Sequence, residues 1–401
     1  MDVFRRPVVR GLLAARAARS LGQGALVAAF ALYLRALGWS APAIGAVLSV
    51  ALLGGAALTI TVGPLSDRVG RRHFLLVYEA AQAAAALAAL ATAWTPALVA
   101  AAVVGGFGRG ANGTAGPFGP LEQAWLAHVV PSGRRGEVFS VNSAVGFLGM
   151  ALGAALAGGV QLLVRPLGPV LAYRPLFLLP LAGSLAAFAV LWTLPEPARE
   201  RAAEDAEAAR SRVRGENAML LKLVTANALN GLGIGMVAPL MAYWLAVRFR
   251  HGPGSIGPAL AACFVLGAVG SVLAAPLARR HGLVRPVVVM RGAGLVLLVS
   301  VPFMPSFALA SALYALRAGF NQGTAGVRQA LAVGLARDRR GLAASLQSVS
   351  IQLPRSVGPL FAALLLHYGH MRAPFIAAAA FQAGYLVLYA RFFKDVPGLP
   401  A

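Results

Sequence analysis

The chain has 401 residues, of which 59% are hydrophobic and 12% are charged, and its mean hydropathy is +0.73. A soluble domain carries about a quarter charged residues, so the main solvent of this chain is predicted to be a lipid bilayer. The net charge of +22 would suggest nucleic acid in a soluble protein, but here the arginines lie in short segments between apolar runs, as topology signals do, and nucleic-acid binding is not expected.

Apolar runs bounded by charges, Pro or Gly predict twelve membrane-spanning helices, because a span needs roughly 20 apolar residues. They cover residues 12–37, 43–65, 74–94, 97–129, 138–163, 175–194, 218–247, 255–278, 286–304, 306–335, 342–367 and 374–394. The basic segment before the first run leads to no small-residue cleavage site, which predicts an uncleaved first span and not a signal peptide. The fold class is therefore predicted to be an all-α membrane protein.

The distribution of Lys and Arg predicts that both termini face the cytoplasm. With the N-terminus inside, the inner segments hold about four times as many Lys and Arg residues as the outer segments, and such an excess marks the cytoplasmic side. Arg16 and Arg19 are counted here with the cytoplasmic N-terminal segment. We expect a multi-pass protein of a bacterial inner membrane.

The longest polar segment, 195–217, alternates acidic and basic side chains with alanines between them. This pattern is typical of an amphipathic surface helix or a solvated linker. The segment divides the chain into an N-terminal six-helix bundle (1–194) and a C-terminal six-helix bundle (218–401).

The two halves repeat each other. Four short segments recur in the same order about 210 residues later: 63–70 as 275–282, 112–116 as 322–326, 122–124 as 328–330, and 134–136 as 339–341. Two six-helix repeats with a binding site between them are typical of secondary transporters.

The segment Gly63-Pro64-Leu65-Ser66-Asp67-Arg68-Val69-Gly70-Arg71-Arg72 is predicted to be a tight turn at the membrane surface, because its charges cannot lie in hydrocarbon. It resembles the motif Gly-x-Leu-x-Asp-Arg-x-Gly-Arg-Arg/Lys between helices two and three of the major facilitator superfamily. Arg109-x-x-x-Gly113 resembles the second motif of that superfamily, and Arg134-Arg135-Gly136 resembles its loop after helix four. The resemblance covers the whole chain and implies two pseudo-symmetric six-helix bundles that rock around a midplane site.

By this resemblance, the first motif latches the two halves together on the inner side when the site is open outward. The latch residues would be Gly63, Asp67, Arg68, Gly70, Arg71 and Arg72. Asp67 is suited to the N-terminus of a neighbouring helix, where the helix dipole favours negative charge. The alternative is that the arginines are only topology signals. The second copy has Arg279 in place of Asp67, which predicts a latch in the N-terminal half alone.

Two positions depart from the superfamily pattern. Residues 153–159 lack the proline of the Gly-Pro-x-x-Gly-Gly run that many drug/proton antiporters carry in helix five. His128 stands where many members have an acid near the inner end of helix four, so that Glu122 or Glu137 would have to substitute for it.

Several charges fall inside the predicted spans. The basic residues are Arg109, Arg291, Arg317, Arg328 and Arg355, and the acids are Glu79 and Glu122. A charge at the centre of a span costs roughly 3 kcal/mol or more, so each should face a partner or a wet cavity. The surplus of arginines has to be answered by water, by backbone carbonyls or by an anionic ligand.

Arg109 and Arg317 lie at equivalent depths of helices four and ten, which by the resemblance line the central cavity. Together they would form a clamp suited to a carboxylate or a phosphate; the alternative is a structural role, with bonds to carbonyls or to Asn112 and Asn321. The other polar candidates for the cavity, which interhelical hydrogen bonds explain equally well, are Gln23, Asn112, Asn227, Asn230, Gln322 and Gln352.

Glu122 and Arg328 occupy equivalent positions of the two repeats and are predicted to meet and close the inner gate. Glu122 is also the best candidate to carry a proton, because opening the gate would remove the arginine and favour the protonated carboxyl group; the alternative is a static ion pair. Glu79 is predicted to pair with Arg71, Arg72 or His73 near the start of helix three.

No other chemistry is indicated. Cys263 is the only cysteine, so neither a disulfide nor a thiol metal site is expected. The chain has no Gly-x-x-x-x-Gly-Lys-Ser/Thr motif, no His or Cys cluster at metal-ligand spacing and no Ser-His-Asp arrangement. We therefore expect no cofactor, no metal and no enzymatic activity.

These observations predict a monomeric secondary transporter of small organic molecules. By resemblance to the efflux branch of the superfamily, it would be a proton-coupled exporter. The surplus of arginines keeps open an organic-anion carrier for uptake or exchange, and a non-transporting membrane receptor or sensor is the alternative from another class.

Overall fold

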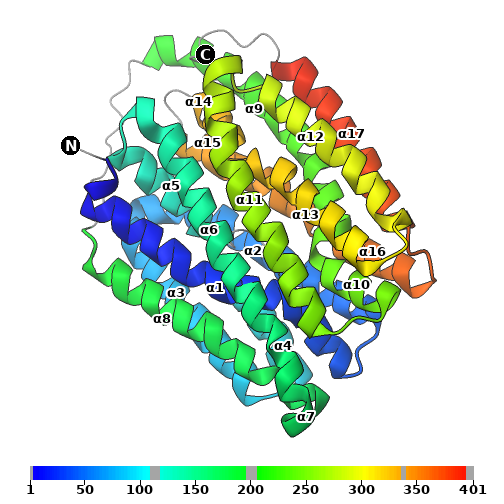
Figure 1. Ribbon diagram of the computed structural model, residues 1–401. Helices are drawn as coiled ribbons and strands as arrows, with labels where there is room; N and C mark the ends of the chain where they lie inside the picture. Colours follow the sequence, from blue (N-terminus) through cyan, green and yellow to red (C-terminus); the bar gives the residue numbers. More distant parts are fainter. Residues whose placement is uncertain (1–2, 109–117, 196–205, 336–339, 394–401) are drawn as a thin grey trace.

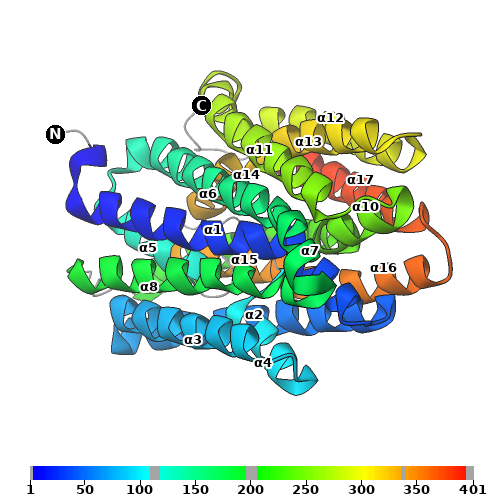
Figure 2. The same cartoon turned by 60° about the horizontal axis from the view of Figure 1, so that its bottom comes forward.

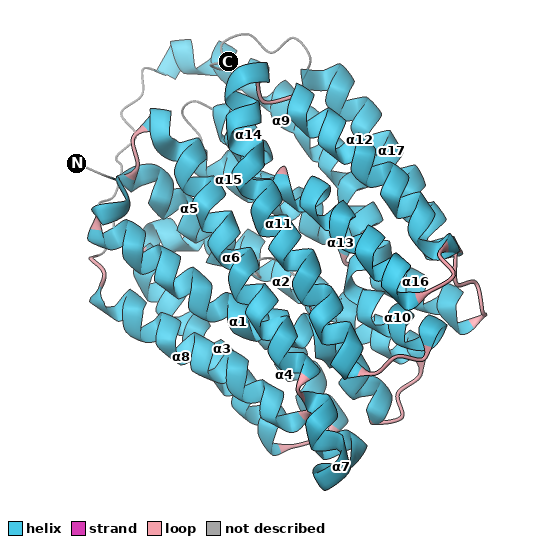
Figure 3. Ribbon diagram, viewed as in Figure 1, coloured by secondary structure: helices cyan, strands magenta, loops and turns pink. Residues whose placement is uncertain are grey.

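The computed structural model describes residues 3–108, 118–195, 206–335 and 340–393, and at some helical positions, among them 62–69, it describes the backbone alone. The described residues are mostly helical, joined by short loops, and contain no strand (Figure 3), which confirms the predicted all-α class. The start of α1 (Pro7–Ala36) and the end of α17 (Ala373–Phe393) lie at the same end of the molecule, here called the terminus-bearing end (Figure 1).

The N-terminal half contains α1 (Pro7–Ala36), α2 (Ala41–Val69), α3 (Arg71–Ala91), α4 (Thr95–Gly105), α5 (Phe118–Val129), α6 (Arg135–Gly158), α7 (Val160–Leu171) and α8 (Leu178–Thr193). The C-terminal half contains α9 (Ala206–Val237), α10 (Met241–Phe249), α11 (Pro253–His281), α12 (Arg285–Ser300), α13 (Phe307–Gly323), α14 (Ala325–Gly334), α15 (Arg340–Arg355), α16 (Gly358–His367) and α17 (Ala373–Phe393).

Each of the twelve predicted spans is mostly helical in the part that the structure describes. Among the described residues, ten helices are long and apolar enough to cross a membrane, and the shorter apolar helices are Thr95–Gly105 and Val160–Leu171. Several predicted spans consist of two helices in succession, such as α13 and α14. Helix α9 begins at Ala206, within the predicted linker at 195–217, and continues into the seventh span without a break.

The motif predicted to form a tight turn is helical for most of its length. Helix α2 continues to Val69, and the single residue that breaks it from α3 is Gly70, whose φ is 112°. The second copy ends in the same way: α11 runs to His281, and Gly282 has a φ of 74°. Glycine adopts positive φ readily, so the repeat preserves this backbone reversal. The side chains of Asp67 and Arg68 are outside the described residues, and the latch stays a prediction.

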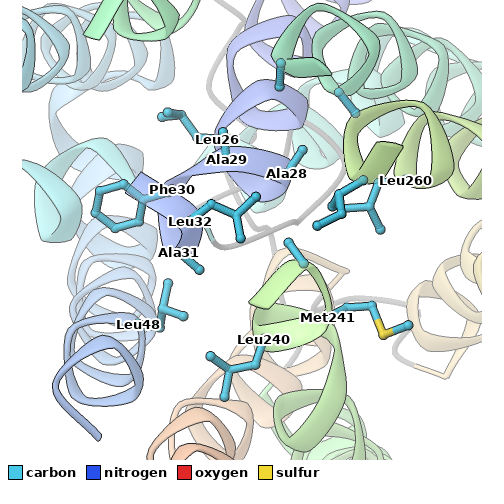
Figure 4. Close-up of a cluster of buried hydrophobic side chains, with 14 of the residues drawn as sticks. Leu26, Ala28, Ala29, Phe30, Ala31, Leu32, Leu48, Leu240, Met241 and Leu260 are labelled. Atoms are coloured by element: carbon cyan, nitrogen blue, oxygen red, sulfur yellow. The ribbon is translucent and has the colours of Figure 1, made fainter. Parts of the chain in front are cut away.

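The two halves pack against each other along most of their length. Helices α6 and α11 lie side by side (Figures 1 and 2), and α2 packs against α15 and α16. The largest apolar cluster joins the halves, with Ala28 and Leu32 of α1 facing Met241 of α10 and Leu260 of α11 (Figure 4). Two smaller clusters lie at the terminus-bearing end, one in each half, and each surrounds buried charges.

Helix α9 crosses α15 and α16 very closely. A Cβ atom added at Gly235 would lie 2.3 Å from the carbonyl oxygen of Arg355. Helix α9 ends two residues later at Val237, and a 3-10 turn (Ala238–Leu240) joins it to α10. Gly235 therefore serves close packing, and Pro239 lies in the break of the seventh span.

Replacing Gly235 with alanine is expected to lower the stability of the folded protein by about 1–3 kcal/mol, because the added methyl group overpacks a backbone-to-backbone contact. Gly292→Ala is the matched control, since a Cβ atom at this helical position meets no atom within 4 Å. Thermal unfolding of both variants in detergent tests this prediction, and equal melting temperatures would contradict it.

Candidate functional site

Helix α1 carries two buried arginines three residues apart, so they share one face of the helix. Arg16 is 1% exposed, and its Nη1 atom lies 3.2 Å from Oε2 of the fully buried Glu122 on α5. Its Nε atom donates to the carbonyl oxygen of Asn142 on α6, at 3.3 Å. This arginine therefore joins three helices of the N-terminal half.

Arg19 forms the second buried ion pair. Its Nε atom lies 2.5 Å from Oε1 of Glu79 on α3, and its Nη2 atom donates to Oε1 of Gln82 at 3.1 Å. The guanidinium carbon lies 3.8 Å from the centre of the Phe118 ring, in a cation–π contact. A carboxylate, an amide and an aromatic face together replace the hydration that the guanidinium group of Arg19 loses on burial.

These contacts correct two predictions. Glu79 was expected to pair with Arg71, Arg72 or His73, and its partner is Arg19. Arg16 and Arg19 were counted with a cytoplasmic segment, but α1 begins at Pro7 and buries both. The sequence signal that could have identified Arg16 and Arg19 as buried is the presence of two acidic residues inside predicted spans, because two buried acids require two basic partners.

The predicted contact between Glu122 and Arg328 is not formed in this structure, because Arg16 takes the place of Arg328 beside Glu122. Arg328 lies on α14, where its charge interacts with that of Arg291 on α12.

Arg72, from the predicted latch, caps a neighbouring helix. Its guanidinium group donates to the carbonyl oxygen of Leu191, at 3.2 Å, and to that of Trp192, both in the last turn of α8. Cationic side chains favour the negative end of a helix dipole. Arg72 thus fastens the start of α3 to the end of α8, within the N-terminal half.

Arg317 is buried on α13. Its guanidinium carbon lies 5.5 Å from the centre of the Tyr314 ring, and its charge interacts with Cys263 of α11. Its Nε atom and Oε1 of Gln322 are buried and have no hydrogen-bond partner among the described residues. Arg109 and Asn112 lie outside the described residues, so the two-arginine clamp remains a prediction.

The other cavity candidates differ in their partners. Asn227 donates to Oε1 of Gln347 at 2.7 Å and to Oγ of Ser350 at 3.1 Å, which joins α9 to α15. Gln352 donates to Oγ of Ser348, one turn earlier on its own helix. The interhelical bonds favour the structural alternative for Asn227, whereas the bond of Gln352 stays within α15 and favours neither alternative.

Asn230 and Gln23 are the remaining candidates. Asn230 accepts from Nη2 of Arg291 at 2.6 Å, a contact between α9 and α12. Gln23 is buried on α1, one turn beyond Arg19, on the same helix as both ion-paired arginines.

Buried charge is distributed unequally between the halves. In the N-terminal half, each of the two acids within a span pairs with an arginine of α1. The predicted spans of the C-terminal half contain no acidic residue, although they carry Arg291, Arg317, Arg328 and Arg355. The first arrangement suits proton exchange, and the second suits an anion, because guanidinium groups match carboxylate and phosphate oxygens in pairs.

Comparisons with known proteins agree with the fold. A sequence model of the Major Facilitator Superfamily matches the chain twice, over residues 12–226 and 223–401. An uncharacterized membrane protein of Saccharomyces cerevisiae is 28% identical over 140 residues, which is 35% of this chain. The match spans 31% of the length of the yeast protein.

Solved structures align over nearly the whole chain. The human organic anion transporter MFSD10 (TETRAN) matches 96% of this chain and 98% of its own, with a TM-score of 0.63 and 19% identity. A D-xylose–proton symporter matches 97% and 98%, with a TM-score of 0.72 and 14% identity. A bacterial homolog of the human lysosomal transporter Spinster, inward-facing and unoccupied, matches 99% and 100%, with a TM-score of 0.71 and 14% identity.

Replacing Glu79 with alanine is expected to destabilise the protein by about 3–5 kcal/mol, because Arg19 is left as an uncompensated buried charge. The control is Glu137→Ala, which removes a half-exposed pair with Arg134 and should cost about 0–1 kcal/mol. Thermal unfolding in detergent measures both variants. Similar losses for the two would show that the buried pair is not a stabilising element.

Proposed function

The chain belongs to the Major Facilitator Superfamily, and on this basis we propose that it is a secondary transporter of small organic molecules that works by alternating access between two faces of a lipid bilayer. We further propose that a proton gradient drives it and that it exports its cargo from the cytoplasm as a monomer. The termini lie on the cytoplasmic side of an inner membrane, as the excess of basic residues on that side indicates.

The observation that carries proton coupling is the buried pair of Arg16 and Glu122. Both helices of this pair border the other half, since α1 packs against α10 and α11, and α5 packs against α15. Rocking of the halves therefore acts on both members of the pair. If the side chains separate, Glu122 becomes an uncompensated buried carboxylate, and proton uptake neutralises it.

The groups around Glu122 make it the better proton carrier of the two buried acids. Arg16 and Arg19 are the charged neighbours on α1, and Asn142 is the polar neighbour on α6. Glu79 is held more tightly, because Arg19 is fixed at the same time by Gln82 and Phe118. The contact predicted from the sequence between Glu122 and Arg328 would belong to another state of the transport cycle.

An organic-anion carrier is the second candidate, and the acid-free spans of the C-terminal half support it. Arg317 is buried on α13 with its Nε atom unpartnered among the described residues. The human organic anion transporter is among the chains that share the fold, at 19% identity. In this alternative, Arg317 and Arg109 hold the anion, with Gln322 and Asn112 orienting it.

Glu122→Gln is expected to abolish the dependence of transport on a pH gradient, because the amide cannot release or take up a proton. The assay is the flux of radiolabelled tetraphenylphosphonium or benzoate across proteoliposomes with and without a gradient. Glu137→Gln is the control and should keep the dependence, since its half-exposed pair lies at the start of α6.

Three outcomes of this assay count against the proposal. Unchanged pH dependence in Glu122→Gln would remove Glu122 from the mechanism. Loss of pH dependence in Glu79→Gln alone would move proton coupling to the Arg19 pair. Absence of flux for both probes in the native protein would favour the receptor or sensor.

Arg317→Gln is expected to remove stabilisation by an organic anion if the second candidate holds. The melting temperature of the native protein should then rise with benzoate and not with tetraphenylphosphonium, because the cation would meet an arginine. The exposed Arg372 supplies the control variant Arg372→Gln. Stabilisation by the cation alone would exclude the arginine clamp.

A further inference from the structure

The internal repeat relates the buried ion pairs of the N-terminal half to a group of residues at the same end of the C-terminal half. Helix α9 corresponds to α1, α12 to α3, and α14 to α5. Glu79 corresponds to Arg291 in the register that superimposes Gly70 on Gly282, and Glu122 corresponds to Arg328 in the register that aligns 122–124 with 328–330. Arg16 and Arg19 have the same spacing on α1 as Asn227 and Asn230 have on α9, and Asn230 contacts Arg291 as Arg19 contacts Glu79. Both arginines of the N-terminal group are thus replaced by asparagines, and both glutamates by arginines.

This exchange changes the net charge of the group. The N-terminal group holds two positive and two negative charges and is neutral, whereas the C-terminal group holds two positive charges and no negative one. Both lie within apolar clusters of the terminus-bearing end, which include Trp125 in one half and Tyr385, Tyr389 and Phe393 in the other. The two groups have comparable apolar surroundings, but the C-terminal group contains no acidic residue to balance its arginines.

The side chains of the C-terminal group converge on one place. Arg291 donates from Nη2 to Oδ1 of Asn230 at 2.6 Å, and its guanidinium carbon lies 4.6 Å from the centre of the Tyr385 ring. Arg328 and Tyr389 interact with Arg291 electrostatically. Four helices contribute to this place: α9, α12, α14 and α17.

The polar atoms that remain in this group are mostly donors. Those that are buried without a hydrogen-bond partner among the described residues are Nη1 of Arg291, Nε and Nη1 of Arg328, Nδ2 of Asn230, and the hydroxyl oxygens of Tyr385 and Tyr389. Unpaired buried donors are rare in folded proteins, because each loses its bonds to water. A set that contains two guanidinium groups and an amide calls for one shared acceptor with negative charge.

Acidic residues are few in the C-terminal half. Between Glu216 and Asp395 the only acidic residue is Asp338, which lies outside the described residues. A variant of Asp338 therefore belongs in any test.

We infer that Arg291, Arg328, Asn230 and the hydroxyl groups of Tyr385 and Tyr389 form a binding site for an oxyanion of the phosphate or carboxylate class. The anion supplies the negative charge that Glu79 and Glu122 supply in the other half. Arginine forks bind such oxygens in pairs. These residues differ from those proposed to hold the cargo, although the charge of Arg317 also acts on Arg291. Arg328 is partly exposed, which leaves a free anion or a phospholipid headgroup as the source.

The test is thermal unfolding of the full chain in detergent, after extensive washing into chloride buffer. Inorganic phosphate added at constant ionic strength is expected to raise the melting temperature by several degrees in a saturable manner, because a ligand that binds the folded state alone stabilises it. Arg291→Gln should lose this shift. In chloride buffer it should be at least as stable as the native protein, because it removes an uncompensated charge. A purely structural role for Arg291 predicts the opposite.

Matched variants make the test specific. Arg285→Gln changes an exposed arginine at the start of the same helix and should keep the full phosphate shift. The double variant Asn230→Arg, Arg291→Glu installs the arrangement of Arg19 and Glu79, and it should fold while losing most of the shift. Asp338→Asn should leave the shift unchanged. A shift that appears only in Asp338→Asn would overturn the inference, because Asp338 would then be the native counter-ion.

The source of the anion is resolved by a parallel series in nanodiscs. Stabilisation by phosphatidylglycerol over phosphatidylcholine, lost in Arg291→Gln, would assign the site to a lipid headgroup, and stabilisation by free phosphate would assign it to a soluble anion. Both support an oxyanion site. Equal responses of the native protein and Arg291→Gln to every anion, or no response together with no bound anion in native mass spectrometry, would overturn it.

Discussion

A guanidinium group inside a bilayer needs a counter-charge or several acceptors, because the cost of its desolvation exceeds what one neutral hydrogen bond returns. Helix α1 carries two such groups, and the arrangement of the N-terminal helices follows from how they are compensated. Helix α3 supplies Glu79, and α5 supplies Glu122. Each pair fixes the depth and rotation of one helix relative to α1, and the apolar cluster of the terminus-bearing end closes around them.

The two halves share their backbone design and differ in their buried chemistry. Gly70 and Gly282 reverse the chain at equivalent points, and α2 and α11 end one residue before them. Among the described residues, in contrast, the buried carboxylates are confined to the N-terminal half, and the predicted C-terminal spans hold arginines without acids. A neutral buried group in one half and a positive buried group in the other therefore lie at the same end of the molecule, on elements that the repeat relates.

Hydropathy was sufficient to predict the helices, because the bilayer requires long apolar runs whatever their packing. Hydropathy did not predict which charged side chains are buried or which residues they pair with, because tertiary packing decides both. Arg16 and Arg19 resemble the flank of an apolar run, yet the helix begins at Pro7 and tertiary contacts bury both. The partners of Glu79 and Glu122 lie on another helix, which no local pattern encodes. The motif at 63–72 was predicted as a turn from its charges, whereas its backbone stays helical as far as Val69 because glycine at position 70 alone is enough to reverse the chain.

The length of α9 has a mechanical consequence. Its 32 residues form a rod of about 48 Å at 1.5 Å per residue, longer than the hydrocarbon core of about 30 Å. The first turns of this rod therefore project beyond the membrane as a stiff extension of the seventh span. When α9 tilts within the bilayer, its projecting turns move with it along the same axis. The described part of the connection between the halves therefore moves rigidly with the seventh span.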